Sequence, residues 1–110
     1  AAYPCEPPEM NLNVIRTFRN QFPDKVIGLS DHQSGISMAL VAFTLGARIL
    51  EKHFTINRTW KGTDHAFSLE PLGLSRVVRD LKRARVAMGD GIKKIWPSEI
   101  PVMKKLRADN

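Results

Sequence analysis

Two apolar segments of the chain run directly into polar side chains that could take part in chemistry. VIGLSDH, residues 26–32, ends in a serine, an aspartate and a histidine, and ARILEKHFTI, residues 47–56, carries a glutamate, a lysine and a histidine. Packing alone does not require these residues, because burying a polar group costs free energy unless it is paired. If both segments are strands, they predict a site to which each contributes its carboxyl end.

The alternation of side chains along a strand sorts these residues by face. Ser30 and His32 share one face of the first segment, and Glu51 and His53 share one face of the second. If both faces point into a barrel of parallel strands, the four side chains gather at its C-terminal mouth, where barrel active sites lie.

A shared metal ion is the chemistry that the histidine pair favours. Neighbouring strands lie about 4.8 Å apart, so His32 and His53 could reach one ion, and imidazole suits manganese, iron, zinc, cobalt or nickel. Two histidines without a thiolate leave coordination positions open for water or substrate. Alternatively, both histidines are hydrogen-bonded structural residues, and on this reasoning alone the two interpretations carry about equal weight. Asp31 and Lys52, on the opposite faces of the two strands, could pair with each other.

The segment after the second strand adds further candidates, each with a plainer interpretation. Asp64 lies in KGTDHAF, and loops after barrel strands carry function, but an aspartate in a loop is commonly a turn former or a helix cap. His65 is interpreted as a surface or packing residue, and Trp60 either covers the site or anchors the loop. The glycines match no phosphate-binding loop of the GxxxxGK[ST] type.

The elements that must position these residues alternate between helix and strand. Hydrophobic spacing predicts a helix over 8–22, a strand over 25–29, a buried helix over 35–45 capped by Gly46, a strand over 47–56, a helix over 71–88, and a linker or extension over 92–110. Strands about twenty residues apart are typical of βα units in a parallel sheet. Two parallel strands need more strands and cover on both faces. The chain is therefore predicted to be the back portion of a larger α/β domain, most simply a (β/α)₈ barrel of about 250 residues.

Composition narrows the class of protein. The 110-residue chain carries a net charge of +6, all of it from residues 76–110, where ten basic residues accompany four acidic ones. A basic end can bind nucleic acid or another polyanion. However, the charges of RVVRDLKRAR alternate with a helical apolar stripe, and no aromatic residue lies among them for base stacking. We therefore interpret this end as the solvated face of a helix followed by a linker.

The cellular compartment can be predicted only from segments and residues that the sequence lacks. No segment approaches the roughly 20 apolar residues of a membrane span, and no signal peptide is expected at the start. A single cysteine, Cys5, excludes an internal disulfide, which fits a reducing compartment.

Four motifs in this order resemble the sialic acid synthases. They are AYP at residues 2–4, GLSDH at 28–32, ILEKHFT at 49–55 and WKGTDHAFSLEP at 60–71. Similar motifs belong to the N-acetylneuraminate synthases and their relatives for legionaminic, pseudaminic and similar nonulosonic acids. The likeness covers about residues 1–100, and the combination of SDH, EKHFT and DHxxSLEP is far more specific than any one motif.

The resemblance implies an α/β fold that is the C-terminal portion of a (β/α)₈ TIM barrel, from about the end of strand six through strand eight. Residues 1–90 would form that part of the barrel, and residues 91–110 the linker toward an antifreeze-like (SAF) domain that lies outside the chain. The parent would be a domain-swapped homodimer in the cytoplasm, and the fragment alone is expected to be inactive.

The resemblance also implies a metal centre. His32 and His53 resemble the two metal ligands of the family, normally for Mn²⁺ or Mg²⁺. Glu51 resembles a glutamate in the outer shell of the metal, where it would orient or deprotonate water as a catalytic residue.

The substrates follow from the same resemblance. Ser30 falls where a serine contacts phosphoenolpyruvate, and Tyr3 and Asp64 fall where the acceptor sugar, N-acetylmannosamine or a related sugar, is held. Asp64 is also expected to act in catalysis by fixing a sugar hydroxyl. The expected reaction is a metal-assisted condensation of the two substrates to a nonulosonic acid and phosphate, without nucleic-acid or membrane partners.

Two other classes of function are weighed against this one. A small basic module would bind nucleic acid or another polyanion through residues 92–110, but the buried helix over 35–45 and the polar strand ends argue against it. A metal-dependent aldolase-type barrel with another substrate would share the site but not the DHAFSLEP segment.

Overall fold

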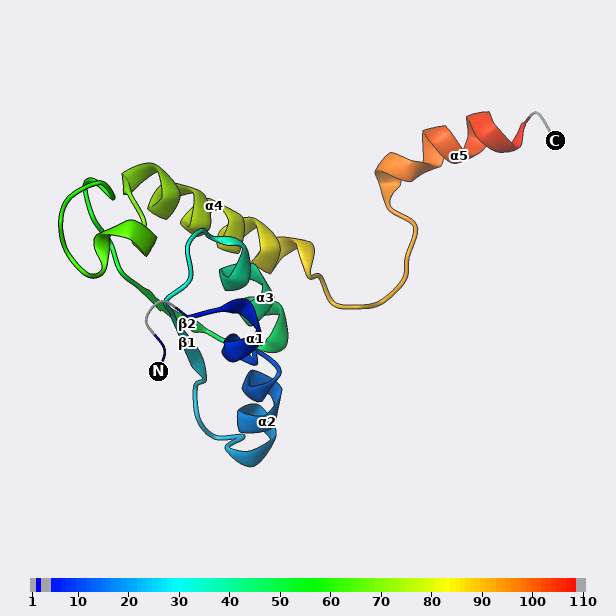
Figure 1. The fold of residues 1–110 in the computed structure, drawn as a ribbon. Coiled ribbons are helices and arrows are strands. Elements are labelled where there is room, and N and C mark those ends of the chain that lie inside the picture. Colours follow the sequence, from blue (N-terminus) through cyan, green and yellow to red (C-terminus); the bar gives the residue numbers. More distant parts are fainter. Residues whose placement is uncertain (1, 3–4, 109–110) are drawn as a thin grey trace.

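The structure, a computed structural model, describes residue 2 and residues 5–108. The elements are α1 (Pro7–Met10), α2 (Val14–Gln21), β1 (Gly28–Asp31), α3 (Ser37–Leu45), β2 (Ile49–Lys52), the 3₁₀ helix η1 (His65–Phe67), α4 (Pro71–Ala87), the 3₁₀ helix η2 (Pro97–Glu99) and α5 (Ile100–Arg107). Figure 1 shows β1 and β2 side by side within the main body, and α5 set apart at the end of an extended segment.

β1 and β2 form a two-stranded parallel sheet connected through α3, which confirms the predicted βαβ order. The register pairs Gly28 with Ile49 and Asp31 with Lys52. The predicted strand bounds of 25–29 and 47–56 are wrong, because a strand extends only as far as its partner. Val26, before the first paired residue, is 69% exposed.

The two faces of this sheet differ in what covers them. α3 packs against β1, and α4 packs against α3. On the covered side Ala39 and Val77 are buried, and Leu50 packs against them. On the other side Ile49 is 60% exposed. Parallel sheets ordinarily have both faces buried, so this open face is one that further protein would cover.

α3 confirms the helix predicted over 35–45, and Gly46 confirms the predicted cap. Gly46 adopts a left-handed conformation with φ 112°, and its N–H donates to the Phe43 carbonyl oxygen at 2.9 Å. Glycine tolerates this conformation without the Cβ clash that other residues meet. The helix is not buried all round as predicted, since Val41 is 40% exposed.

The single helix predicted over 8–22 is wrong, because the structure divides it into α1 and α2. Asn11 stands between them with φ 43°, a left-handed conformation that asparagine adopts more readily than most residues. Ile15 of the predicted stripe is buried, whereas Phe18 is 44% and Phe22 49% exposed. The two phenylalanine rings meet edge to face at 6.2 Å between centroids.

α4 confirms the helix predicted over 71–88 to within a residue, and Pro71 occupies its first turn, where a missing N–H costs nothing. The predicted inner stripe is only partly right. Val77 is 2% exposed, but Val78 is 43% and Met88 56% exposed.

The C-terminal region extends away from the main body (Figure 1). The radius of gyration is 19.2 Å, against about 13 Å for a compact domain of 100 residues. α5 has its main contact with η2, and neither was predicted within the expected linker. No helix in the described part of the chain has the length and apolar character needed to span a membrane.

Candidate functional site

The carboxyl ends of β1 and β2 bring the predicted polar residues together. The Ser30 hydroxyl donates to Glu51 Oε1 at 2.6 Å, and Ser30 Oγ lies 3.0 Å from His32 Nε2. Ser30 and Glu51 are register partners, so their side chains project from the same, open face of the sheet. These side chains therefore lie on one face of the sheet, as the alternation along each strand predicted.

The imidazole rings of His32 and His53 lie beside each other at this edge. Their centroids are 5.1 Å apart and their planes are inclined by 59°. Phe67 of η1 meets both rings edge to face, with centroid distances of 6.4 Å to His32 and 5.7 Å to His53. His32 Nδ1 and His53 Nε2 are both shielded from solvent.

The segment after β2 returns to the sheet and holds Phe67 in place. The Leu69 N–H donates to the His53 carbonyl oxygen, and the Thr55 N–H donates to the Leu69 carbonyl oxygen, both at 2.8 Å. Phe54 and Leu69 also form an isolated parallel bridge. Backbone hydrogen bonds therefore fix the position from which the aromatic ring covers the imidazoles.

The hydrogen bonds of Ser30 assign the tautomer of a neutral His32. A hydroxyl has one proton, and a carboxylate can only accept. Because Ser30 gives its proton to Glu51, His32 Nε2 must carry the proton that it shares with Ser30 Oγ. The lone pair of the neutral ring is then on Nδ1.

Asp31 and Lys52 form the predicted ion pair on the covered face of the sheet. Lys52 Nζ lies 3.1 Å from Asp31 Oδ2, and the two side chains are 4% and 1% exposed. Lys52 Nζ also donates to the Gln33 carbonyl oxygen, and the Gln33 N–H donates to Asp31 Oδ1 at 2.9 Å. The Gln33 amide in turn donates to the Cys5 carbonyl oxygen at 2.6 Å. This closed network surrounds the backbone of the residue that follows His32.

The donor chemistry fits a divalent metal as a partial ligand set. Two neutral imidazoles from adjacent strands can bind one ion, and Glu51 is linked to His32 through the Ser30 hydroxyl. Across residue 2 and residues 5–108, no group of three or more His, Cys, Asp or Glu side chains is arranged to hold a metal. His32 and His53 would therefore need water, substrate or further protein to complete the coordination.

The remaining predicted residues do not join this cluster within the described part of the chain. Asp64 precedes η1, where its carbonyl oxygen accepts from the Ser68 hydroxyl, and its carboxylate makes no hydrogen bond to the strand ends there. His65 Nδ1 lies 2.7 Å from Thr55 Oγ1, which agrees with the predicted packing role. Trp60 stacks edge-on against His65 with centroids 6.0 Å apart. Tyr3 lies outside the described residues.

Sequence reasoning missed Phe67 and Gln33. Phe67 is 8% exposed and covers both imidazoles, and the only available signal was an apolar residue inside an otherwise polar loop. Gln33 follows SDH directly, but nothing in its residue type predicted that its backbone would contact both members of the ion pair.

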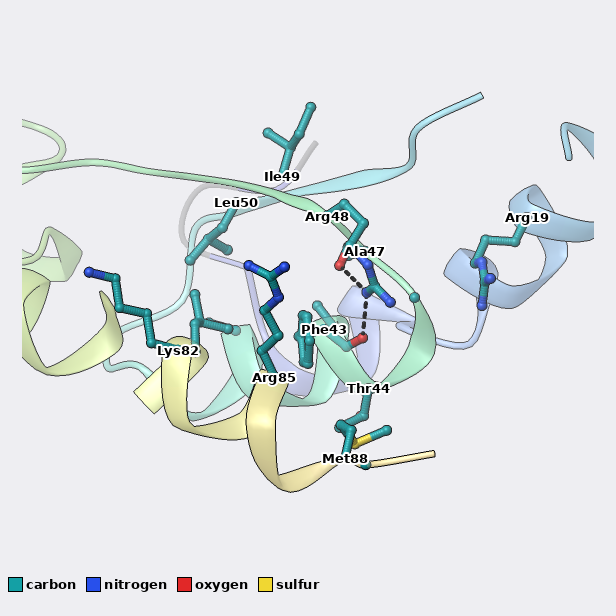
Figure 2. A pocket seen from close by; sticks show the side chains of 15 residues that line it. Arg19, Phe43, Thr44, Ala47, Arg48, Ile49, Leu50, Lys82, Arg85 and Met88 are labelled. Atoms are coloured by element: carbon teal, nitrogen blue, oxygen red, sulfur yellow. Dashed lines mark hydrogen bonds between the residues drawn. The ribbon is translucent and has the colours of Figure 1, made fainter. Parts of the chain in front are cut away.

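A cavity lies at the other end of β2 from the imidazoles. It has a volume of about 790 Å³ and is lined by four basic side chains, Arg19, Arg48, Lys82 and Arg85, among apolar ones. Figure 2 shows Arg48 donating hydrogen bonds at its wall, to the carbonyl oxygens of Phe43 at 3.1 Å and Ala47 at 2.8 Å. Arg48 therefore binds one carbonyl oxygen in the last turn of α3 and one in the residue that precedes it in the chain. The other three basic residues are exposed to solvent, so the chemically equipped site is the strand end instead.

Comparisons with known proteins identify the family to which this site belongs. The NeuB family matches residues 1–93. N-acetylneuraminate-9-phosphate synthase of Homo sapiens is 42% identical over 106 residues, which cover 96% of this chain and 30% of that protein. N,N'-diacetyllegionaminic acid synthase of Campylobacter jejuni is 42% identical over 97 residues, which cover 88% of this chain and 29% of that protein.

A solved structure agrees with the sequence relatives. The N-acetylneuraminic acid (sialic acid) synthetase of Leptospira borgpetersenii, crystallised in complex with citrate, superposes with a TM-score of 0.79 at 34% identity and covers 98% of this chain and 38% of that one. This likeness defines the class of protein as a mixed α/β part of a sialic acid synthase structure.

The chain belongs to the NeuB family of sialic acid synthases. It spans about 30% of the length of the curated relatives that it matches. The strand-end cluster lies within residues 1–93, the part of the chain that the family covers.

Proposed function

We propose that this chain is the C-terminal part of the catalytic (β/α)₈ barrel of a nonulosonic acid synthase, from about the end of strand six through strand eight. The observation that carries this proposal is the pair of imidazoles, 5.1 Å apart, at the carboxyl ends of two register-paired parallel strands. The exposed Ile49 on the same face supports it, because in a barrel that face would be interior.

The whole enzyme condenses phosphoenolpyruvate with N-acetylmannosamine or a related amino sugar. C3 of phosphoenolpyruvate forms the new bond to the aldehyde carbon of the open-chain sugar, and the aldehyde oxygen takes up a proton. Water adds at C2 of the former phosphoenolpyruvate, and phosphate leaves. The products are a nonulosonic acid and inorganic phosphate.

His32 and His53 hold the divalent metal, Mn²⁺ or Mg²⁺. Such an ion supplies Lewis-acid polarisation of the aldehyde when it is bound. The hydrogen bond between His32 and Ser30 keeps the proton on Nε2 and so presents Nδ1 as the binding atom. Phe67 keeps bulk water from the far side of both rings.

The remaining polar residues bind the substrates and handle protons. Ser30 contacts phosphoenolpyruvate, and Glu51, which already accepts a hydrogen bond from Ser30, orients the attacking water and takes its proton. Asp64 and Tyr3 hold hydroxyl groups of the sugar. Asp64 reaches the sugar from the loop after β2, which begins at the edge where the imidazoles lie.

The same proposal covers the surroundings of the barrel. Residues 91–110 form the linker toward an antifreeze-like domain, and the projection of α5 away from the main body supports this role (Figure 1). The parent is a domain-swapped homodimer in the cytoplasm. The isolated chain lacks most of the barrel and does not turn over.

The test is an assay of phosphate release from phosphoenolpyruvate by the full-length protein that carries this chain, with N-acetylmannosamine and Mn²⁺. His32→Ala and His53→Ala should each reduce kcat/KM by at least a hundredfold, because each removes one of the two imidazole ligands to the metal, a larger change than the loss of an outer-shell partner. The metal affinity measured by calorimetry should fall with the activity.

The third histidine of the chain provides a matched control. His65→Gln removes an imidazole that contacts Thr55 and Trp60 but lies outside the proposed ligand pair, so it should keep kcat/KM within about tenfold. Near-normal activity in either ligand variant, or equal losses in all three, would contradict the metal assignment.

A further inference from the structure

The ion pair between Asp31 and Lys52 is buried in a place where packing favours apolar residues. The same face of the sheet carries Leu29 and Leu50, which pack against the two apolar clusters of the core. A buried ion pair gains little over a well-packed apolar pair, because removing two charges from water offsets most of their attraction. Stability alone therefore does not account for a charged pair that is 1% and 4% exposed.

The pair holds the backbone on which the imidazoles depend. Asp31 accepts from the Gln33 N–H, and Lys52 donates to the Gln33 carbonyl oxygen. His32 lies between Asp31 and Gln33 in the chain, so its backbone is fixed on both sides. Lys52 also directly precedes His53, so the pair ties together the two backbone positions from which the rings project.

We propose that Asp31 and Lys52 are positioning residues that set the spacing of His32 and His53. This inference rests on the proposed function of the histidine pair and extends it to residues on the opposite face of the sheet. Neither Asp31 nor Lys52 contacts the imidazoles through its side chain in the hydrogen bonds described above. They act through the strand register and through the Gln33 peptide group.

Single and double replacements of the ion pair can separate its role in positioning the histidines from its role in stability. Removing one member leaves an unpaired buried charge, which destabilises the fold, whereas replacing both by apolar residues of similar volume is often neutral for stability. If the pair were only structural, the double replacement would recover both the stability and the metal site. If the pair positions the histidines, the double replacement recovers the stability but not the metal site.

The experiment compares Asp31→Leu, Lys52→Met and the double variant Asp31→Leu/Lys52→Met in the full-length protein. Thermal unfolding should show lower midpoints for both single variants and a largely recovered midpoint for the double variant, in which no buried charge is left unpaired although the Gln33 peptide group loses these two partners. The affinity for Mn²⁺, measured by calorimetry, should stay about 10- to 100-fold weaker in the double variant, the usual effect of losing outer-shell support. Co²⁺ substitution adds a second readout, because its absorption spectrum reports the ligand geometry and should differ from that of the wild type.

A surface pair serves as the matched control. The hydrogen bond from Arg79 holds the pKa of the half-buried Asp80 carboxyl below its usual value, yet this pair lies on α4 away from the strand ends. Arg79→Gln/Asp80→Asn should leave both the Mn²⁺ affinity and the cobalt spectrum unchanged.

Two results would overturn the positioning role. The first is a double variant whose Mn²⁺ affinity and cobalt spectrum return to the wild-type values together with its unfolding midpoint. If the double variant does not fold, Asp31→Asn provides the second test, since the amide oxygen can still accept from Gln33. Its Mn²⁺ affinity should fall by less than that of Asp31→Leu, because the contact with the Gln33 N–H remains although Lys52 loses its charged partner. A loss as large as that of Asp31→Leu would overturn the inference. Failure of the proposed function is distinguishable, because His32→Ala would then leave Mn²⁺ binding unchanged.

Discussion

At the scale of residues, the two strand ends place one polar pair on each face of the sheet. Ser30 and Glu51 meet on the open face, where they are exposed, whereas Asp31 and Lys52 meet on the face covered by helices. Consecutive polar residues along each strand thus supply one member of the Ser30–Glu51 pair and one member of the Asp31–Lys52 pair. Each strand contributes a member to each pair, so a shift in register by one residue would break both pairs.

Ser30 provides the first prediction at this scale. Ser30→Ala removes the hydrogen bonds to Glu51 and His32, so nothing on this side fixes the proton on His32 Nε2. We expect the affinity for Mn²⁺ to fall about tenfold, with little loss of stability because Ser30 is exposed. Calorimetric titration of the full-length protein measures the affinity, and denaturation measures the stability.

Ser30→Thr is the matched control, because it keeps the hydroxyl on an open face that has room for a methyl group. It should restore most of the Mn²⁺ affinity that Ser30→Ala loses. Equal affinities for the alanine variant and the wild type would show that the Ser30 hydroxyl does not determine the state of His32.

At the scale of elements, the end of α3 determines how β2 enters the sheet. Gly46 reverses the chain with φ 112°, and Arg19 from α2 packs directly against it. A Cβ at this position would lie 2.3 Å from Arg19 Cδ. The turn therefore depends both on a left-handed backbone and on the absence of a side chain.

Gly46→Ala should lower the free energy of unfolding by about 1–2 kcal/mol, the cost of a left-handed conformation for a residue with a Cβ. Displacement of Arg19 adds to this cost. Gly89→Ala is the control, because Gly89 is also left-handed, with φ 60°, but has no atom within 4 Å of its Cβ position.

The segment after Gly89 is extended and exposed, so local unwinding can relieve strain there. Urea denaturation should therefore show a smaller effect for Gly89→Ala than for Gly46→Ala. The opposite order would mean that the turn before β2 does not constrain the sheet.

At the scale of the whole molecule, the chain consists of a βαβ body and a projecting C-terminal arm. The body buries only one face of its sheet, and the arm has its main contact within itself, between α5 and η2 (Figure 1). This shape is what a part of a larger assembly requires, because the exposed Ile49 of the open face and an unpacked helix both gain stability when other protein covers them.

Limited proteolysis provides the prediction at this scale. Lys93 and Lys94 lie in the extended segment before η2, whereas Arg76 and Lys82 lie in α4. Proteases cut exposed, extended backbone in preference to helices, so trypsin should cut first after Lys93 or Lys94. Mass spectrometry of the early fragments identifies the site.

The basic residues of α4 act as an internal control, since their side chains are exposed as well. First cuts after Arg76 or Lys82 would show that α4 opens before the arm does. Such an order would contradict the division into body and arm.

Residue type and spacing alone show which residues belong together. Alternation along a strand is a local property, so it predicted that Ser30, His32, Glu51 and His53 would share a face. Opposite parity predicted the ion pair, which the structure confirms. Capping residues are local as well, and Gly46 and Pro71 marked helix ends that the structure contains. The family could also be recognised from the sequence, because each of its motifs is a continuous stretch of residues.

Features that depend on distant partners could be seen only after the chain was folded. The strand limits follow from pairing, so the bounds predicted from apolar residues were wrong. Phe67 covers the imidazoles because Leu69 bonds back to His53, and the Gln33 peptide bridges the ion pair because two strands bring both partners to it. The physical reason is that residue type and spacing fix which side of an element a side chain occupies, whereas non-local hydrogen bonds and packing fix what it meets there.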